Sequence, residues 1–299
     1  MNHTQLRGIL VPLVTPFATD GSVARPALEA LAHTALDEGA TGLAALGTTA
    51  EAAALDEAER RAVVEVVAGV CRERGATLLV GTGGAGTRGA GEALLALAKN
   101  TPEAAAAMVT VPAFTRPGEA GVVAHFRRLA EVSPVPLVLY HVPYRTGQQL
   151  GAAALLELAA VPGVAGVKYA AGGIDQDTVE LLGRAPAGFA VLAGDDAFVS
   201  PLLALGAAGG ILASAHLATA RFVELADAWQ AGDVARARPL GHRLAGLALA
   251  SFAAPNPTVI KGVLHAQGRI PTPDVRLPLL PAAPAEVAAA LAHTEQLAG

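Results

Sequence analysis

The stretch Val164-Ala165-Gly166-Val167-Lys168-Tyr169-Ala170 places a lysine near the end of an apolar, β-branched run. Such a run is typical of a strand that is covered on both faces. A lone ammonium group is costly to bury in apolar surroundings, so these neighbours favour the neutral amine, which is a nucleophile. The sequence therefore predicts a buried strand that carries a reactive amine near its carboxyl end.

The other two lysines of the chain have more ordinary surroundings. Lys99 closes a helical run, where a cation meets the last carbonyls of the helix. Lys261 lies in a predicted helix over residues 257–266, and we expect its amine to reach water from there. Lys168 is thus the candidate for amine chemistry, although a lysine that merely ends an edge strand stays open as an alternative.

Apolar runs like this one recur along the chain and alternate with helical periodicity. Strands are expected at residues 6–14, 42–47, 77–80, 105–111, 136–142, 164–170, 189–193 and 211–215, and helices at 24–38, 56–74, 87–99, 118–131, 150–159 and 177–183. Eight strand-then-helix units spaced by roughly 20 to 35 residues predict an α/β fold, a (β/α)8 TIM barrel, over residues 1–225. Helical patterns without strands at 221–230, 234–252, 257–266 and 285–297 predict a C-terminal helical domain over residues 226–299.

Composition limits the class of protein. The chain has 299 residues, of which 53% are hydrophobic and 4% aromatic, so a large core must be built mainly from Ala, Val and Leu. A net charge of -5 with interspersed acids and bases argues against nucleic acid or an anionic membrane as a partner. The single cysteine, Cys71, excludes an intramolecular disulfide, and no leader pattern begins the chain; both fit the cytoplasm.

One uncharged segment, residues 197–220, has the length of a membrane span. Pro201, Gly206 and the pair Gly209-Gly210 interrupt it. We interpret it as a short helix, a turn and the strand at 211–215, buried within the barrel.

The predicted strand ends carry polar groups suited to catalysis. Active sites of (β/α)8 barrels lie at the carboxyl ends of the strands. An amine at such an end condenses with a ketone to a Schiff base, and a phenol moves the protons that this requires. Hydroxyls and backbone N–H groups ahead of a helix hold a carboxylate. The residues concerned are Thr48 and Thr49 after the second strand, Tyr140 and then Arg145 after the fifth, Lys168 on the sixth, Gly194 after the seventh and Ile211 on the eighth. The alternative, that the threonines only cap a helix and the tyrosine only packs, stays open for each residue alone.

Five motifs together resemble the dihydrodipicolinate synthase and N-acetylneuraminate lyase family over nearly the whole chain. They are Gly47-Thr48-Thr49-Ala50-Glu51, Tyr140-His141-Val142-Pro143-Tyr144-Arg145-Thr146-Gly147, Gly166-Val167-Lys168, Gly194-Asp195-Asp196 and Pro255-Asn256-Pro257. The resemblance implies a class I lyase that forms a covalent Schiff base with pyruvate and needs neither metal nor cofactor. It also implies a homotetramer or homodimer.

The same resemblance assigns roles to the candidate residues. Lys168 would form the Schiff base, Tyr140 would shuttle protons, and Thr48 and Thr49 would hold the pyruvate carboxylate or relay its proton. Gly194 and Ile211 would line the pyruvate site.

Arg145 bears on the second substrate. It stands where the synthases of this family keep an arginine for the carboxylate of aspartate semialdehyde, and a guanidinium binds a carboxylate in a bidentate manner. The Gly-Thr-Thr sequence also favours the synthase branch, which serves lysine biosynthesis. A 2-keto-3-deoxy sugar-acid aldolase or dehydratase of the same family is the alternative.

Three residues depart from the synthase pattern. Phe114 stands where the synthases carry a tyrosine that reaches the site of a neighbouring subunit, so the ring is kept and the hydroxyl is lost. Tyr169 follows the lysine in place of a glutamate, and Ala50 replaces a glycine. A paralogue that binds a keto acid without turnover is therefore an alternative of another class.

Two further patterns are given little weight. Gly81, Gly83 and Gly86 fit a dinucleotide fingerprint, but the next strand ends without an acid for a ribose. The residues Asp195, Asp196, His141 and His216 lack the spacing of metal ligands, so no metal site is predicted.

Overall fold

The computed structural model describes residues 6–83 and 86–298. The leader prediction concerned residues that lie largely outside this range. Within the described residues, the strands are β1 Gly8–Pro12, β2 Gly42–Ala45, β3 Thr77–Gly81, β4 Ala106–Thr110, β5 Leu137–His141, β6 Val164–Tyr169, β7 Ala190–Ala193 and β8 Gly209–Ile211. The α-helices are α1 Arg25–Asp37, α2 Glu57–Arg74, α3 Thr87–Asn100, α4 Gly118–Val132, α5 Pro143–Thr146, α6 Ala152–Ala159, α7 Gln176–Arg184, α8 Val199–Ala204, α9 Ala215–Gln230, α10 Val234–Ser251, α11 Thr258–Ala266 and α12 Pro284–Ala298. Short 3-10 turns are η1 Thr48–Ala50, η2 Ala52–Ala54 and η3 Asp196–Phe198.

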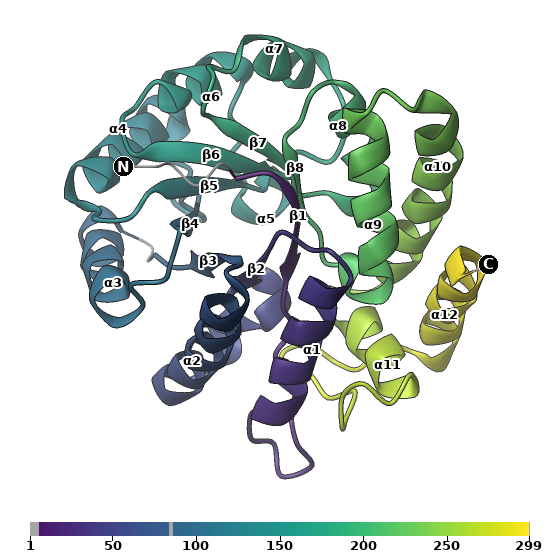
Figure 1. Ribbon diagram of the computed structural model, residues 1–299. Coiled ribbons are helices and arrows are strands. Elements are labelled where there is room, and N and C mark those ends of the chain that lie inside the picture. Colours follow the sequence, from purple (N-terminus) through teal and green to yellow (C-terminus); the bar gives the residue numbers. More distant parts are fainter. Residues whose placement is uncertain (1–5, 84–85, 299) are drawn as a thin grey trace. The chain divides into compact units, whose positions relative to one another are not determined.

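The strands pair in chain order from β1 to β8 and form a closed barrel, which confirms the predicted (β/α)8 fold (Figure 1). The pairing is parallel wherever its register is defined, as in β4 with β5 and β5 with β6. Tyr140 on β5 lies opposite Lys168 on β6, and His141 lies opposite Tyr169. Successive residues of a strand point to opposite faces of the sheet. The side chains of Tyr140 and Lys168 therefore lie on one face, and those of His141 and Tyr169 lie on the other.

Local sequence signals explain why several helices begin and end where they do. Asp56 caps α2 by accepting a hydrogen bond from the N–H of Glu59, whose side chain accepts one from the N–H of Asp56 in return. Gly75 ends the helix with a φ of 61°, a left-handed conformation that a glycine adopts without strain. Asp175 and Thr178 form a similar box at the start of α7.

Three elements differ from the prediction. The eighth strand lies at Gly209–Ile211, not at 211–215, because Gly209 and Gly210 pair with Leu192 and Ala193 of β7. The glycine pair looked like a turn because glycine is rare within strands. α9 begins at Ala215, earlier than expected, with an interruption at Ala218. The one-turn helix α5 after β5 was not predicted at all.

The chain consists of two compact units, one that includes residues 6–7 and 79–211 and one of residues 8–78 and 212–299. In the second unit α9 packs against β1, and α10, α11 and α12 pack against one another and against α9. The predicted boundary between the barrel and the C-terminal helical domain, at residues 225 and 226, falls inside helix α9. This domain boundary stays a prediction. The C-terminal segment after α10 contains no strand among the described residues, as predicted (Figure 1).

The uncharged segment 197–220 is divided among η3, α8, β8 and the start of α9. No helix in the described part of the chain combines the length and the apolar character that crossing a membrane requires.

Candidate functional site

Lys168 lies at the penultimate position of β6, where the sequence placed it. Its side chain is buried, with 5% of the residue exposed, and Tyr140 on the neighbouring strand is buried to a similar degree. The Lys168 Nζ atom lies 4.4 Å from the centroid of the Tyr140 ring. The structure therefore brings the predicted amine and the predicted phenol into contact on one face of the sheet.

Gly194 makes room for this lysine. A Cβ atom at residue 194 would lie 2.9 Å from Cγ and 3.2 Å from Cε of Lys168, closer than carbon atoms approach without displacement. Because Gly194 has no side chain, the side chain of Lys168 can extend past the end of β7. Asp195 is close enough for the charge of Lys168 to act on it, although burial outweighs that effect and raises the pKa of the Asp195 carboxyl.

The opposite face of these strands holds a second polar pair. Tyr169 forms a hydrogen bond of 3.0 Å between its hydroxyl and Thr178 Oγ1 on α7, so this face is the one turned toward the helices. The His141 ring lies 5.7 Å from the Tyr169 ring, and both of its nitrogens are buried without a hydrogen-bond partner. Burial lowers the pKa of His141 to about 4, which makes it a neutral packing residue.

Arg145 lies on α5, in the turn that follows β5. It is exposed, and its Nε donates a hydrogen bond of 2.9 Å to the hydroxyl of Tyr144. The guanidinium also lies over the Tyr144 ring at 5.1 Å from the centroid. Arg145 was predicted from the sequence, but its contact with Tyr144 was not, because the motif at residues 143–147 does not indicate which of its side chains touch.

The two threonines form the turn η1, in the unit of residues 8–78 and 212–299. Within this turn the N–H of Ala50 donates to Gly47 and that of Glu51 to Thr48. Thr15 Oγ1 donates a hydrogen bond of 2.8 Å to the carbonyl of Ala50. Thr49 is 2% exposed, whereas Thr48 is partly exposed.

Asn256 and Lys261, from the start of the α11 region, contact this turn. Asn256 Nδ2 donates a hydrogen bond of 2.9 Å to Thr49 Oγ1. Lys261 Nζ lies 2.9 Å from Glu51 Oε1, and the backbone N–H of Arg276 donates to Glu51 Oε2 at 2.6 Å. The turn is thus fixed by residues more than 200 positions further along the chain.

The expectation that Lys261 reaches water is wrong. The residue is 0% exposed, its amine lies 4.1 Å from the centroid of the Phe17 ring, and burial lowers its pKa while Glu51 opposes that shift. Its helix is buried from Thr258 to Leu264 and so offers no route to solvent. Its counter-charge, Glu51, lies in an otherwise apolar turn, and the φ of 55° at Glu51 marks this turn as strained.

Ile211 and Phe114 complete the predicted set. Ile211, the last residue of β8, is fully buried. Phe114 is 94% exposed and adopts a φ of 65°, a region that a non-glycine residue rarely occupies. The ring therefore projects into solvent from the loop after β4.

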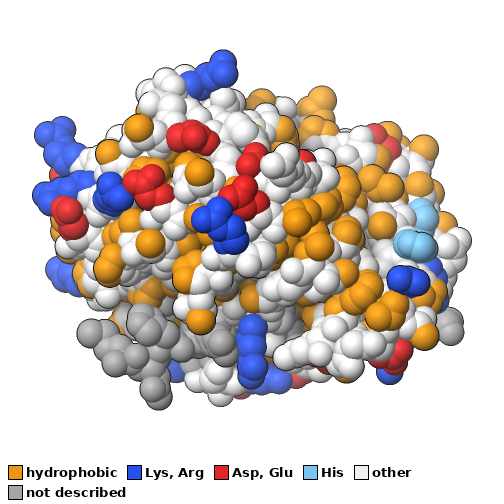
Figure 2. All heavy atoms as spheres, turned by 90° about the horizontal axis from the view of Figure 1, so that it is seen from above, with side chains coloured by type: hydrophobic (Ala, Val, Ile, Leu, Met, Phe, Trp, Pro, Cys, Tyr) orange, Lys and Arg blue, Asp and Glu red, His pale blue; other side chains and the backbone are white. Residues whose placement is uncertain are grey.

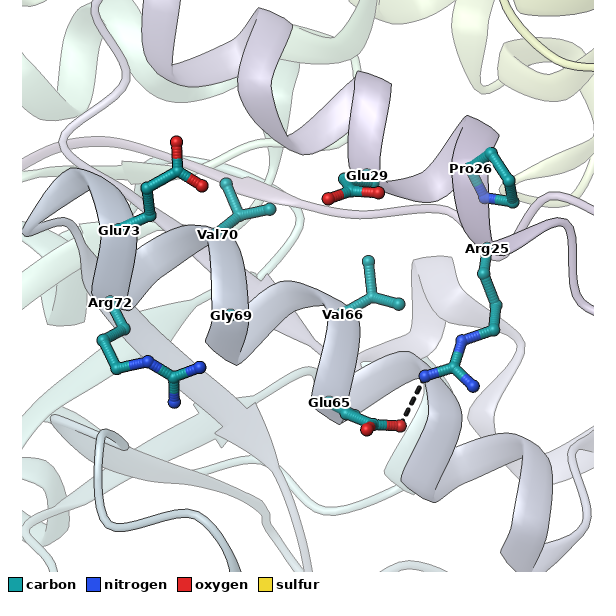
Figure 3. A pocket seen from close by; sticks show the side chains of 9 residues that line it. All are labelled: Arg25, Pro26, Glu29, Glu65, Val66, Gly69, Val70, Arg72 and Glu73. Carbon is teal, nitrogen blue, oxygen red and sulfur yellow. Dashed lines mark hydrogen bonds and ion pairs between the residues drawn. The ribbon is translucent and has the colours of Figure 1, made fainter.

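Other surface features lie apart from these residues. A shallow groove between α1 and α2 is lined by acidic and basic side chains, among them the ion pair of Arg25 with Glu65 (Figure 3). On the face drawn in Figure 2, acidic and basic side chains lie among one another.

No group of three or more His, Cys, Asp or Glu residues in the described ranges is arranged to hold a metal ion.

Comparison with known proteins gives the family. The model of the dihydrodipicolinate synthetase family matches residues 5–296. The chain belongs to this family. It is similar to the 4-hydroxy-tetrahydrodipicolinate synthase of Neisseria meningitidis serogroup C, strain 053442, with 37% identity over 98% of this chain and 100% of the relative. The family and the enzyme class predicted from the sequence, a lyase or synthase, are thereby confirmed.

Solved structures of the family agree with this fold. The chloride-inhibited dihydrodipicolinate synthase of Acinetobacter baumannii, complexed with pyruvate, has a TM-score of 0.89 with 32% identity and covers 97% of this chain and 99% of that one. A structure described as the first monomeric dihydrodipicolinate synthase variant has a TM-score of 0.93 with 26% identity, over 100% of this chain and 99% of that one. The family works through a covalent Schiff base between pyruvate and a lysine, without a cofactor.

Proposed function

We propose that this family member is a 4-hydroxy-tetrahydrodipicolinate synthase that condenses pyruvate with aspartate semialdehyde through a Schiff base on Lys168. The observation that supports this most directly is the buried amine of Lys168, held 4.4 Å from the ring centroid of Tyr140 at the carboxyl ends of adjacent strands. The curated relatives carry this activity in their names.

The chemistry follows from a buried amine beside a phenol. The Lys168 nitrogen attacks C2 of pyruvate, and loss of water from the carbinolamine leaves a protonated imine. Removal of a proton from C3 gives an enamine, which attacks the aldehyde carbon and forms the new carbon–carbon bond. The amino group of the added aspartate semialdehyde then attacks the imine carbon, which closes the ring and releases Lys168 as the free amine. Tyr140 is assigned the proton transfers of these steps, which typically contribute 10²- to 10⁴-fold to the rate.

Thr48 and Thr49 are assigned to the pyruvate carboxylate. Support comes from the turn itself: the amides of Ala50 and Glu51 are bonded within it, whereas those of Thr48 and Thr49 form no hydrogen bond to another described residue. Gly194 and Ile211 are assigned to the lining of the pyruvate site, Gly194 because it leaves space for the lysine side chain.

Arg145 is assigned to the carboxylate of the second substrate. Its guanidinium is exposed and oriented by the Tyr144 hydroxyl, so its remaining N–H donors stay available to an acidic aldehyde. A sugar-acid aldolase of the same family would act on uncharged aldehydes and would have no need of this group.

Assembly as a homodimer or homotetramer is part of the proposal, with the cytoplasm as the location. The Phe114 ring is 94% exposed, and contact with a second copy would remove its apolar surface from water, which is favourable. Light scattering at micromolar concentration tests this: Phe114→Asp should lower the molar mass if the ring lies in the interface.

Borohydride trapping tests the central step. Reduction in the presence of pyruvate should add one pyruvate-derived group to the peptide that contains Lys168, and Lys168→Ala should abolish the adduct. A coupled assay with aspartate semialdehyde against a panel of sugar-derived aldehydes then identifies the second substrate. An adduct without turnover of any aldehyde would favour the binding paralogue, and the absence of an adduct contradicts the proposal.

A further inference from the structure

Asn256 forms a buried hydrogen bond to one of the two threonines assigned to pyruvate. Its Nδ2 atom lies 2.9 Å from Thr49 Oγ1, with the asparagine 8% and the threonine 2% exposed. Water therefore does not compete for this hydrogen bond. It joins the loop before α11 to the turn η1, both in the unit of residues 8–78 and 212–299.

The bond has a fixed direction. A side-chain amide nitrogen donates hydrogen bonds and does not accept them, so Thr49 Oγ1 must be the acceptor. A hydroxyl has a single proton, and the proton of Thr49 then stays available for another acceptor. No hydrogen bond from the Thr49 hydroxyl to a described residue uses this proton. In this orientation Asn256 Oδ1 is buried without a hydrogen-bond partner. The reverse orientation would instead bury both N–H donors of the amide without an acceptor, which is the less favourable arrangement because orphaned donors are rarer in proteins than under-satisfied acceptors.

The position of Thr49 is also fixed from several sides. The carbonyl of Ala50 accepts from Thr15, and the Glu51 carboxylate accepts from Lys261 and from the backbone N–H of Arg276. The turn can therefore not rotate to find another partner for its hydroxyl without breaking buried hydrogen bonds. A group held in place and limited to donation is suited to an anionic oxygen atom.

We propose that Asn256 is a positioning residue that makes the Thr49 hydroxyl a hydrogen-bond donor toward the carboxylate of the bound keto acid. The inference rests on the proposed function, because it takes pyruvate as the ligand of the turn. Asn256 itself need not touch the substrate. Its effect passes through a single oxygen atom, which allows a sharp test.

Asn256→Asp tests the direction of the bond. An ionised carboxylate only accepts hydrogen bonds, so it would take the Thr49 proton and leave the keto acid without it. We expect KM for pyruvate to rise about 10- to 100-fold, the usual range for losing a hydrogen bond to a charged group, while kcat changes less than about 3-fold. Asn100→Asp at the exposed end of α3 makes the same chemical change and should leave KM unaltered.

The double variant with Thr49→Val separates this effect from simple charge repulsion. Thr49→Val alone removes the donor and should raise KM to a similar extent. If Asn256 acts through Thr49, adding Asn256→Asp to Thr49→Val raises KM no further than about 2-fold, whereas independent effects multiply. Multiplied effects, or an unchanged KM in Asn256→Asp, overturn the inference.

Asn256→Ala serves if the aspartate variant fails to fold. It leaves the hydroxyl without a fixed direction, so a smaller rise in KM is expected, and that rise should vanish in the Thr49→Val background. An unchanged KM in Asn256→Ala overturns the inference as well. Borohydride trapping of the wild-type protein with pyruvate separates the test of the proposed function from the test of Asn256. The absence of an adduct on the Lys168 peptide refutes the proposed function. If the adduct forms but the KM effects of the two substitutions multiply, only the role of Asn256 is refuted.

Discussion

Replacing Lys261 by methionine should destabilise the protein strongly although the residue takes no part in the proposed reaction. The change keeps the length of the side chain and removes its charge. Lys261 and Glu51 have side chains that are 0% and 1% exposed, and their charged atoms lie 2.9 Å apart. Methionine leaves the Glu51 carboxylate buried, with the backbone N–H of Arg276 as its hydrogen-bond donor.

The expected cost is about 3–5 kcal/mol, the range found when one partner of a buried ion pair is removed. For a chain of this size a loss of 1 kcal/mol lowers the melting temperature by roughly 2 °C, so a decrease of about 6–10 °C is expected. Thermal unfolding followed by circular dichroism and equilibrium unfolding in urea both measure it. Lys99→Met, at an exposed site on α3, is the matched control and should stay within about 0.5 kcal/mol of the wild type.

A second variant identifies the buried carboxylate as the cause. Combining Lys261→Met with Glu51→Gln removes the unpaired charge and keeps an acceptor for Arg276, so a large part of the lost stability should return. The reasoning is refuted if Lys261→Met unfolds within 1 kcal/mol of Lys99→Met, or if the added Glu51→Gln makes the protein less stable still.

Four further outcomes are expected. Tyr140→Phe keeps the packing of the ring and removes its hydroxyl, so kcat should fall 10²- to 10⁴-fold, and a smaller decrease would argue against a proton-transfer role. Gly194→Ala places a Cβ atom 2.9 Å from the side chain of the reactive lysine, so the rate of adduct formation with pyruvate should drop while the secondary structure seen by circular dichroism is kept. Tyr144→Phe frees the Arg145 guanidinium, so KM for the acidic aldehyde should rise several-fold and KM for pyruvate should stay constant; equal rises in both would contradict the assigned role. The pKa of His141 is lowered to about 4 in the folded protein and is near 6.5 in the unfolded chain. Its contribution to stability is therefore present above pH 6.5 and is lost as the pH falls toward 4. In His141→Asn, the slope of the unfolding free energy against pH should decrease in this window by up to about 1.4 kcal/mol per pH unit.

Local patterns were sufficient to predict most of the fold. Asp56 and Gly75 fixed the ends of α2 because a cap and a left-handed glycine act through near neighbours in sequence. The approach of Lys168 and Tyr140 was predictable too, since both residues end strands of a barrel in which consecutive strands are neighbours.

Interactions between distant segments were not predictable in this way. Periodicity places Lys261 on a helix but does not indicate that every side of this helix is covered, and it gives no sign that Glu51 supplies the counter-charge. The bond from Asn256 to Thr49 likewise joins residues whose separate motifs say nothing of each other. The register of Gly209 and Gly210 depended on β7, which a one-dimensional pattern does not include.

The long separation between the threonine turn and its supports has a consequence for biosynthesis. A nascent chain contains Thr49 once its first sixth has been translated, but the groups that hold this residue, Asn256 and Lys261, leave the ribosome only near the end. A fragment released before residue 256 would therefore carry the threonines without their supports. Such truncated products should therefore fail to bind the keto acid.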